Sequence, residues 1–397
     1  MSSPADENAV PEYEDFDIVE RGFSHWIGQR LGVVGSQSSR RLLKIGLLLA
    51  LTWLPLAALS LMAGQAWGTS VKVPFFLDPE VHARLLFALP LLELGEVVVA
   101  FSLRVQARHL VERGVVPARC LPEFRAAQAA VAWLRDSVVA EVGIVVLSYF
   151  LSILFRLFIG IDDGASSWER TEGAVTAAGW WHMLVSLPFL YFFLLRWLLV
   201  LVSWATFLYL VSRIPLELTP THPDHTGGLG FLGWGLASFA AVLMATSAVF
   251  SAGFATEIIH KHESLNSLKY HVAAFVVIAL VILHAPLLAF VGQLARCRFK
   301  GLLEFGALVW RHDRAFDEKW IHNAAKIDPA SILGTADVQS MADLASCYDH
   351  INEMWPMPFD VKAFAVLVLA ALLPMLPLLA TAIPVQEILL KLGELLV

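Results

Sequence analysis

The chain has 397 residues, of which 57% are hydrophobic and 16% are charged, and its mean hydropathy is +0.66. These values lie outside the range of ordinary soluble domains and predict an integral membrane protein in contact with a lipid bilayer. The net charge of −7 does not identify a partner, because much of the acidic excess lies in the first twenty residues. No feature of the composition indicates nucleic-acid binding.

Residues 1–41 precede the first apolar run and are rich in acidic side chains. The acids before the first basic residue are Asp6, Glu7, Glu12, Glu14, Asp15, Asp17 and Glu20. Such a composition cannot bury a core, so we predict a disordered acidic tail. A cleavable signal peptide is not expected, since about forty mainly polar residues come before the first apolar run.

Seven apolar runs are long enough to cross a hydrocarbon core of about 30 Å as helices. They lie at residues 42–63, 83–103, 137–159, 179–212, 228–251, 271–293 and 361–381. Lipid offers no partners for free backbone N–H and C=O groups, so these runs must be helical. We predict an all-α fold with helices one to six in residues 42–293, and with the seventh helix and a short amphipathic helix in residues 361–397.

Basic residues collect before the first run and in the second and sixth connections. Short loops rich in Lys and Arg stay in the cytoplasm, so the N-terminus is expected inside and the C-terminus outside the plasma (inner) membrane. All three cysteines then fall on the cytoplasmic side, where thiols remain reduced. They are Cys120, Cys297 and Cys347.

The sixth connection, residues 294–360, is too long for a simple link. Two sets of apolar residues recur there at helical spacing, which predicts that the sixth helix continues past the membrane and that a second helix lies near 336–354. The sets are Phe305, Val309, Phe316 and Trp320, then Val338, Met341, Ala345, Tyr348 and Ile351. The two stripes are expected to pack against each other or a neighbouring subunit in a cytoplasmic helical cap. A homo-oligomer and a cytoplasmic protein partner are both open.

The stretch THPDHTGG, residues 221–228, resembles the zinc loop of metallo-β-lactamase-fold hydrolases. Pro220 stands where that loop has its first histidine, and the motif lies between apolar helices rather than in an alternation of strands and helices. The hydrolase interpretation is therefore rejected. Binding of a divalent metal or an anion by His222, Asp224 and His225 remains the alternative to a structural role.

The structural interpretation of the same stretch is a capped and tightly packed helix start. Asp224 is placed to accept hydrogen bonds from free N–H groups at the beginning of a helix. Gly227, Gly230 and Gly233 follow at a spacing of three, where they would let another backbone approach closely.

The segments HPDHTGGLGFLG, ILGTADVQSMADLASCY (residues 332–348) and MPFD (residues 357–360) resemble an uncharacterised group of bacterial multi-pass membrane proteins. The resemblance runs over most of the second half of the chain. It implies a bacterial inner membrane and no particular activity.

Ionisable residues within the predicted spans include Glu93 and Glu96, Glu141, Arg196 and His284. Arg156 lies toward the outer end of the third span, from which it can reach the headgroups. Inserting each of them into the membrane at the centre of a helix costs a free energy of at least about 2.5 to 3.5 kcal/mol, unless the side chain is paired or hydrated. Glu93 and Glu96 share one helix face near mid-depth, within reach of Arg196. Three acids with one deep base would leave excess negative charge, which requires a protonated carboxyl, a cation or water.

These charges suggest a proton- or cation-conducting channel or transporter with the five residues other than Arg156 along its pathway. The alternative is a non-transporting scaffold or sensor that recruits partners through its cytoplasmic helices, with the charges fixing helix register. A membrane-embedded metal enzyme is the least favoured reading. The sequence has no P-loop, dinucleotide fingerprint, Gly-x-Ser-x-Gly elbow or HExxH motif, so no nucleotide or flavin cofactor is expected and an enzyme is disfavoured.

Overall fold

The computed structural model describes Val19 and residues 37–158, 166–171, 173–261, 265–323 and 336–378. Helices dominate these ranges, and seven helical segments are long and apolar enough to cross a membrane. The all-α fold and the seven predicted spans are thus confirmed. Most of the predicted tail at 1–41 and the predicted amphipathic helix after residue 378 lie outside the described residues.

The first four spans come from the first half of the chain. They comprise α2 (Gln37–Thr52) with α3 (Leu54–Met62); α4 (Pro79–His82), η2 (Ala83–Ala88) and α5 (Leu89–Glu112); α7 (Val138–Phe158); and α8 (Ala177–Trp181), η4 (His182–Ser186) and α9 (Leu187–Val211). Short 3-10 turns, η1 (Phe75–Leu77) and η3 (Ala118–Cys120), and the helix α6 (Leu121–Arg135) lie in the connections.

The last three spans follow. They comprise α10 (Gly230–Gly235), η5 (Leu236–Phe239) and α11 (Ala240–Lys261); α12 (Leu265–His284), η6 (Ala285–Phe290) and α13 (Val291–Phe316); and α15 (Val361–Leu372) with η10 (Leu373–Met375). The π turn η7 (Asp317–His322) prolongs α13, and α14 (Ala336–Asn352) returns along it.

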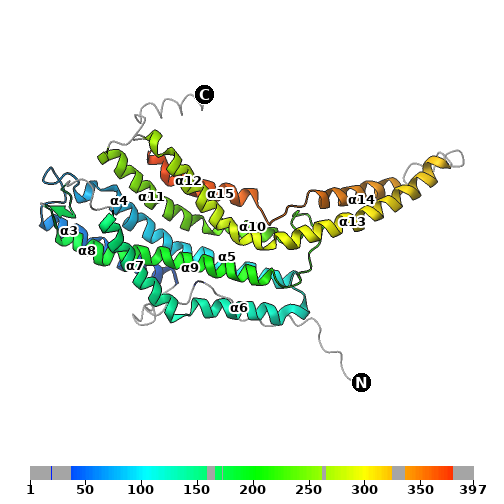
Figure 1. The fold of residues 1–397 in the computed structure, drawn as a ribbon, viewed down its shortest axis with the longest axis horizontal. Helices are drawn as coiled ribbons and strands as arrows, with labels where there is room; N and C mark the ends of the chain where they lie inside the picture. Colours follow the sequence, from blue (N-terminus) through cyan, green and yellow to red (C-terminus); the bar gives the residue numbers. More distant parts are fainter. Residues whose placement is uncertain are drawn as a thin grey trace, which may run out of the picture.

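The bundle has two distinct ends (Figure 1). α5, α9, α11 and α12 run lengthwise, and α13, η7 and α14 project from one end as a two-helix arm. At the opposite end a short antiparallel hairpin, β1 (Arg170–Thr171) and β2 (Ala174–Val175), leads directly into α8. We call these the arm end and the hairpin end.

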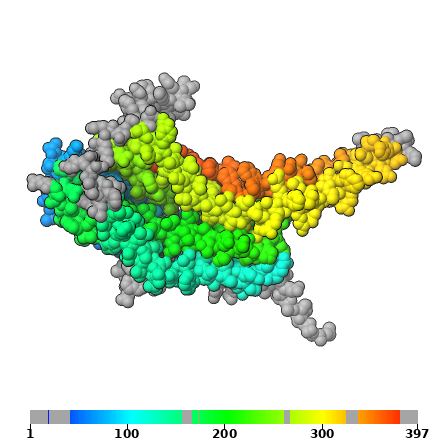
Figure 2. All heavy atoms as spheres, viewed as in Figure 1, coloured from blue at the N-terminus to red at the C-terminus, as the bar shows by residue number. Residues whose placement is uncertain are grey.

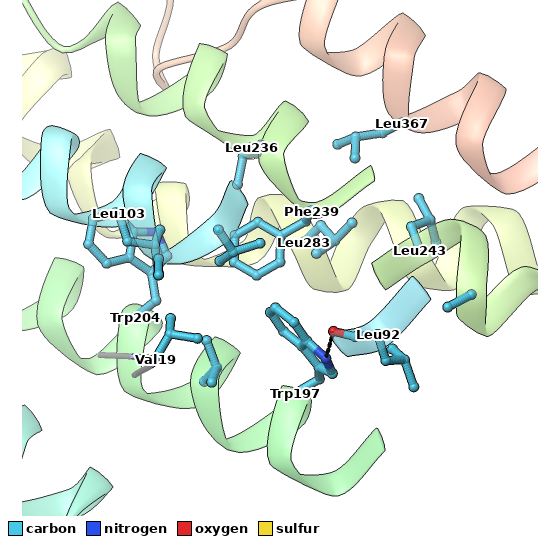
Figure 3. Close-up of a cluster of buried hydrophobic side chains, with 14 of the residues drawn as sticks. Val19, Leu92, Leu103, Trp197, Trp204, Leu236, Phe239, Leu243, Leu283 and Leu367 are labelled. Atoms are coloured by element: carbon cyan, nitrogen blue, oxygen red, sulfur yellow. Dashed lines mark hydrogen bonds between the residues drawn. The ribbon is translucent and has the colours of Figure 1, made fainter. Parts of the chain in front are cut away.

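The core of the bundle is a continuous apolar cluster between α5, α9, α11, α12 and α15 (Figure 3). Trp197 lies in it with 7% of its surface exposed, packs against Phe239 and donates from Nε1 to the carbonyl of Leu92 at 3.2 Å. The polar edge of this buried indole is thereby satisfied, so the large ring can be buried without an unpaired donor.

The helix α7 presents a mostly apolar surface to its surroundings. Val139 is 83% exposed and Val146 and Phe150 are more than half exposed. In water such a surface would be unfavourable, whereas hydrocarbon tails solvate it at no cost. The exposed side of α7 is therefore a lipid-facing surface.

The arm contains both helices expected in residues 294–360. Phe305, Val309 and Phe316 of α13 are half-buried, and Gly306 lies against the ring of Tyr348 on α14. The stripe predicted on α14 is only partly used, because Ile351 is buried while Val338, Met341 and Ala345 are exposed. The stripe was wider than the surface that α13 covers.

The three glycines predicted to share a helix face have different roles. α10 begins at Gly230, so Gly227 lies before it and adopts a left-handed φ of 65°. A Cβ on Gly233 would lie 2.6 Å from the carbonyl oxygen of Pro358, and one on Gly235 would lie 2.1 Å from Gln106 Nε2. Close approach of another backbone is thus required at Gly233, where the chain enters α15.

We expect Gly233→Ala to lower the free energy of unfolding by about 1 to 3 kcal/mol, because the new methyl group collides with backbone atoms that cannot rotate away. Gly253→Ala in α11 is the control, since nothing lies within 4 Å of its Cβ position. Thermal unfolding of the two variants in detergent measures the difference. Equal melting temperatures would contradict this account of the α10–α15 contact.

Candidate functional site

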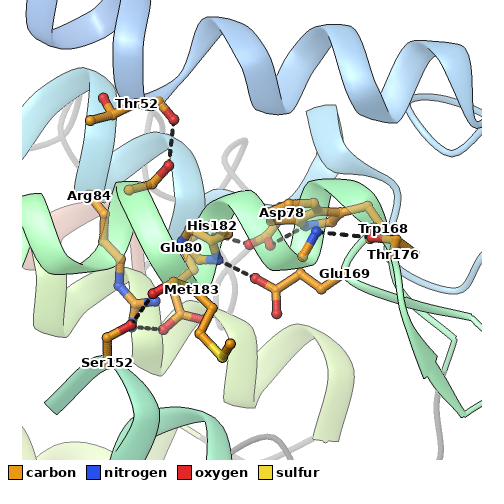
Figure 4. Close-up of polar contacts among 12 residues, drawn as sticks. Thr52, Asp78, Glu80, Arg84, Ser152, Trp168, Glu169, Thr176, His182 and Met183 are labelled. Carbon is orange, nitrogen blue, oxygen red and sulfur yellow. Dashed lines mark hydrogen bonds and ion pairs between the residues drawn. The ribbon is translucent and has the colours of Figure 1, made fainter. Parts of the chain in front are cut away.

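A cluster of ionisable side chains lies at the hairpin end, where three spans meet the hairpin (Figure 4). Its members are Asp78, Glu80, Arg84, Glu169 and His182, which we call the hairpin-side cluster. Glu80 lies within electrostatic range of the other four. Sequence reasoning missed this site, because Glu80 fell just before the predicted second span and His182 was not considered.

Two π turns bring Arg84 and His182 into the cluster. In η2 the N–H of Leu89 bonds to the carbonyl of Arg84, and in η4 the N–H of Leu187 bonds to that of His182, five residues back in both cases. Each turn ends two residues before a proline of the next helix, Pro90 or Pro188, and proline has no N–H to continue the normal ladder. A Leu-Pro pair shortly after an ionisable residue was the available sequence signal.

The Arg84 guanidinium is enclosed by partners from two directions. It forms an ion pair with Glu80, one turn earlier on the same span, and its centre lies 4.7 Å from the ring centroid of Phe155 on α7. The ring face attracts the cation, so α7 contributes to holding the pair in place.

The imidazole of His182 is 4% exposed and its Nδ1 bonds to the Glu169 carboxylate. Its Nε2 is buried and has no hydrogen-bond partner, and its ring packs on Trp168. A buried ring nitrogen without a partner is uncommon, since most such groups are satisfied. Nε2 is therefore the open edge of an otherwise enclosed ring.

Asp78 and Gly179 fix the hairpin over the cluster. The Asp78 carboxylate accepts from the N–H of Glu80 at 2.9 Å and from Nε1 of Trp168 at 2.8 Å, joining α4 to the hairpin segment. A Cβ on Gly179 would lie 2.4 Å from the carbonyl oxygen of Glu169. Glycine is therefore required for α8 to approach the hairpin this closely.

On the arm side of the hairpin-side cluster, each of the two glutamates of α5 has a base. Glu93, 3% exposed, lies 3.0 Å from Nζ of Lys44, and Glu96 lies 2.8 Å from a guanidinium nitrogen of Arg196. Arg196 also donates to the carbonyl of Val19 at 2.9 Å. We call the two contacts the arm-side ion pairs. Lys44 is a second base that the expected set of three acids around Arg196 did not include.

The heights of α7 and the fourth span are tied together near these ion pairs. Ser152 of α7 donates to the carbonyl of Met183 at 2.6 Å, which fixes the register of α7 against the fourth span. Arg196 is thirteen residues after Met183, and Val138 is fourteen residues before Ser152, about 20 Å in both cases at 1.5 Å per residue. Arg196 is therefore level with the first turn of α7, and it lies near the middle of the apolar segment Ala177–Val211.

The remaining residues of the predicted pathway are Glu141 and His284. Glu141 stands in the first turn of α7. His284 is bonded through Nδ1 to the carbonyl of Leu280 at 2.8 Å and packs against Phe359 and Phe364. Its contacts are those of a packing residue.

The loop before α10 is organised by the Asp224 carboxylate. One oxygen accepts from the N–H groups of Thr226 at 2.9 Å and Gly228 at 3.1 Å, and the other accepts from that of Gly230 at 2.8 Å. Burial raises the pKa of the Asp224 carboxyl, but these three N–H groups outweigh it and hold the pKa below its usual value. The aspartate is thus a cap at the start of α10.

The predicted metal site is not assembled around this loop. His222 lies 2.8 Å from Asp224 through Nδ1, while His225 turns away, stacks on His350 of α14 and lies 4.0 Å from Glu353. Across the described ranges, no three His, Cys, Asp or Glu side chains are grouped so that they could hold a metal ion. The histidines join the loop to the arm instead.

No family model matches the chain, and no curated protein or solved structure is detectably similar to it. The function must therefore be argued from the geometry of the two charged sites and the arm.

Asp224→Asn should lower the free energy of unfolding at neutral pH by about 1 to 2 kcal/mol, because an amide cannot accept from all three N–H groups. The folded pKa is depressed, so the stabilisation is present above the unfolded value of about 3.9 and is lost as pH falls through the folded value. Melting temperatures of both proteins from pH 6 to pH 3 should therefore converge. A gap that stays constant would mean that the carboxylate charge is not responsible.

Proposed function

We propose that the chain is a non-transporting scaffold of the plasma membrane, whose arm binds a protein partner on the cytoplasmic side. The observation that carries the proposal is the pairing of Glu93 with Lys44 and of Glu96 with Arg196. The basic residues of the connections support a cytoplasmic arm and N-terminus.

Paired charges serve a scaffold better than a pathway. Each pair joins two spans, α2 to α5 and α5 to α9, so it fixes their register along the membrane normal. A path for protons or cations needs a carboxylate that can change its charge or partner, and a carboxylate held by a base resists both changes.

The arm is the element suited to recruitment. It projects beyond the bundle (Figure 2), and it carries exposed apolar side chains next to charged ones in its sequence. Apolar groups outside the lipid-facing bundle have no reason to be exposed unless another surface covers them. The interaction is therefore assigned to the arm rather than to the spans.

Removing the acids of the arm-side ion pairs tests their structural role. Glu93→Gln with Glu96→Gln leaves Lys44 and Arg196 without their carboxylates, which should cost about 1 to 3 kcal/mol of stability for each pair. Lys44→Met with Glu93→Met removes both members of one pair and should lower the free energy of unfolding by less, because no unpaired charge is left behind. Unfolding in detergent compares the variants. Full stability of the double glutamine variant would contradict a register role.

A proton or cation pathway is the second candidate, and the hairpin-side cluster is what favours it. Around Glu80 lie two further acids, Asp78 and Glu169, the permanent cation Arg84, and His182 with its unpartnered Nε2. Such a cluster can exchange a proton at one boundary of the membrane.

Flux in liposomes separates the two functions. The scaffold proposal expects no proton or monovalent-cation flux above that of protein-free vesicles across an imposed gradient. Flux that is lost in Glu80→Gln with His182→Gln would favour the second candidate at the hairpin end. Flux that is lost in Glu93→Gln with Glu96→Gln would overturn the scaffold proposal and restore the pathway through the arm-side glutamates.

Recruitment by the arm is tested with a photo-crosslinking amino acid in living cells. Placed at Trp310 on α13, it should give protein adducts, whereas at Phe150 on the lipid-facing side of α7 it should give few. Both positions are more than half exposed, so accessibility is matched. Equal yields at the two positions, or none at Trp310, would contradict a protein-binding arm.

A further inference from the structure

The arm does not bury a core of its own. In residues 302–323 and 336–350 every side chain is exposed or only half-buried. Two helices that bury so little apolar surface are marginal in water, because tertiary packing supplies most of the stability of a helix. A further surface packed against the described arm would therefore bury apolar area that the arm leaves exposed.

The uncovered side of α13 is an apolar stripe edged with bases. Phe299, Leu303 and Trp310 recur at intervals of four and seven residues and are each at least 60% exposed. Lys300 follows Phe299, and the Arg314 guanidinium lies 5.4 Å from the Trp310 ring centroid. This stripe is complementary to a partner surface that is apolar and carries negative charge.

The uncovered side of α14 has the complementary character. Val338, Met341 and Ala345 are exposed along one side, and the exposed Asp349 continues the same row. These residues were expected to face α13, and instead they are open to a partner. Their row suits an apolar surface that carries positive charge.

The two helices carry opposite net charge. α13 has five basic and two acidic residues, a net charge of +3, and α14 has three acidic residues and no Lys or Arg, a net charge of −3. Within the described part of the arm, one ion pair joins the two antiparallel helical segments, and it is formed by Lys319 and Asp337. Most of this complementary charge is therefore not used inside one chain.

We propose that the arms of two copies of this chain dock on each other, with α13 of each copy against α14 of its partner. This inference rests on the proposed function and names the partner as a second copy. A two-fold axis along the membrane normal would apply each contact twice, as in other isologous dimers.

The size of the exposed surface fits such a contact. Six large apolar side chains of the arm, about half exposed, present on the order of 600 Å² per chain, against about 800 Å² per partner in a standard interface. They are Phe299, Leu303, Trp310, Ile321, Val338 and Met341. The bilayer also holds copies in one plane with their arms parallel, which raises their effective concentration.

Charge reversal with mixing tests the proposal on the full chain. One variant carries Arg296→Glu, Lys300→Glu and Arg314→Glu on α13, and the other carries Asp349→Lys on α14. Light scattering in detergent should show a dimer for the wild type and a dimer dissociation constant at least about tenfold weaker for each variant alone. An equimolar mixture of the two variants should regain dimers, because each reversed helix then meets a reversed partner.

The mixture also guards against misfolding, since an unfolded arm could not be rescued. A wild type that stays monomeric at every concentration would overturn the proposal, as would variants that dimerise like the wild type or a mixture that stays monomeric. Adducts of the crosslinker at Trp310 to a different protein, with a monomeric wild type, would leave the scaffold function standing and remove the second copy. No adducts at all would remove both.

Discussion

A charge placed inside an apolar bundle needs an opposite charge at its own depth, and this constraint fixes how the helices stand against each other. The ion pair of Glu93 with Lys44 fixes the position of α2 along the membrane normal, and the ion pair of Glu96 with Arg196 fixes that of α9. Apolar packing between Leu, Val and Phe side chains tolerates sliding by a turn far better than an ion pair does. The charged residues therefore supply the vertical register that the apolar core alone would leave loosely defined.

The same constraint operates at the opposite end, where the backbone adapts to it. Arg84 and Glu96 belong to one helical segment and are twelve residues apart, so the two charged layers are separated by roughly 18 Å at 1.5 Å per residue. The π turns before Pro90 and Pro188 rotate Arg84 and His182 toward the hairpin.

The number and position of the spans could be predicted from the sequence, because a long apolar run with few charges has few other stable outcomes. The cap by Asp224 could be predicted too, since it depends on neighbours within six residues. The partner of Glu93 could not, because Lys44 is 49 positions away and its depth is set by tertiary packing. Periodicity likewise identified the stripe on α14 without telling which part of it faces α13.

The arm is continuous with a membrane span, and this gives it a mechanical property. α12 passes through η6 into α13 and η7, and the part beyond the buried Gly301, residues 302–322, is about as long as α12. Twenty-one residues at 1.5 Å make a lever of about 32 Å, whose tip would move about 5 to 6 Å for a tilt of about 10° at its base. Changes in bilayer thickness too small to alter the bundle would thereby displace the tip of the arm by about the width of one side chain.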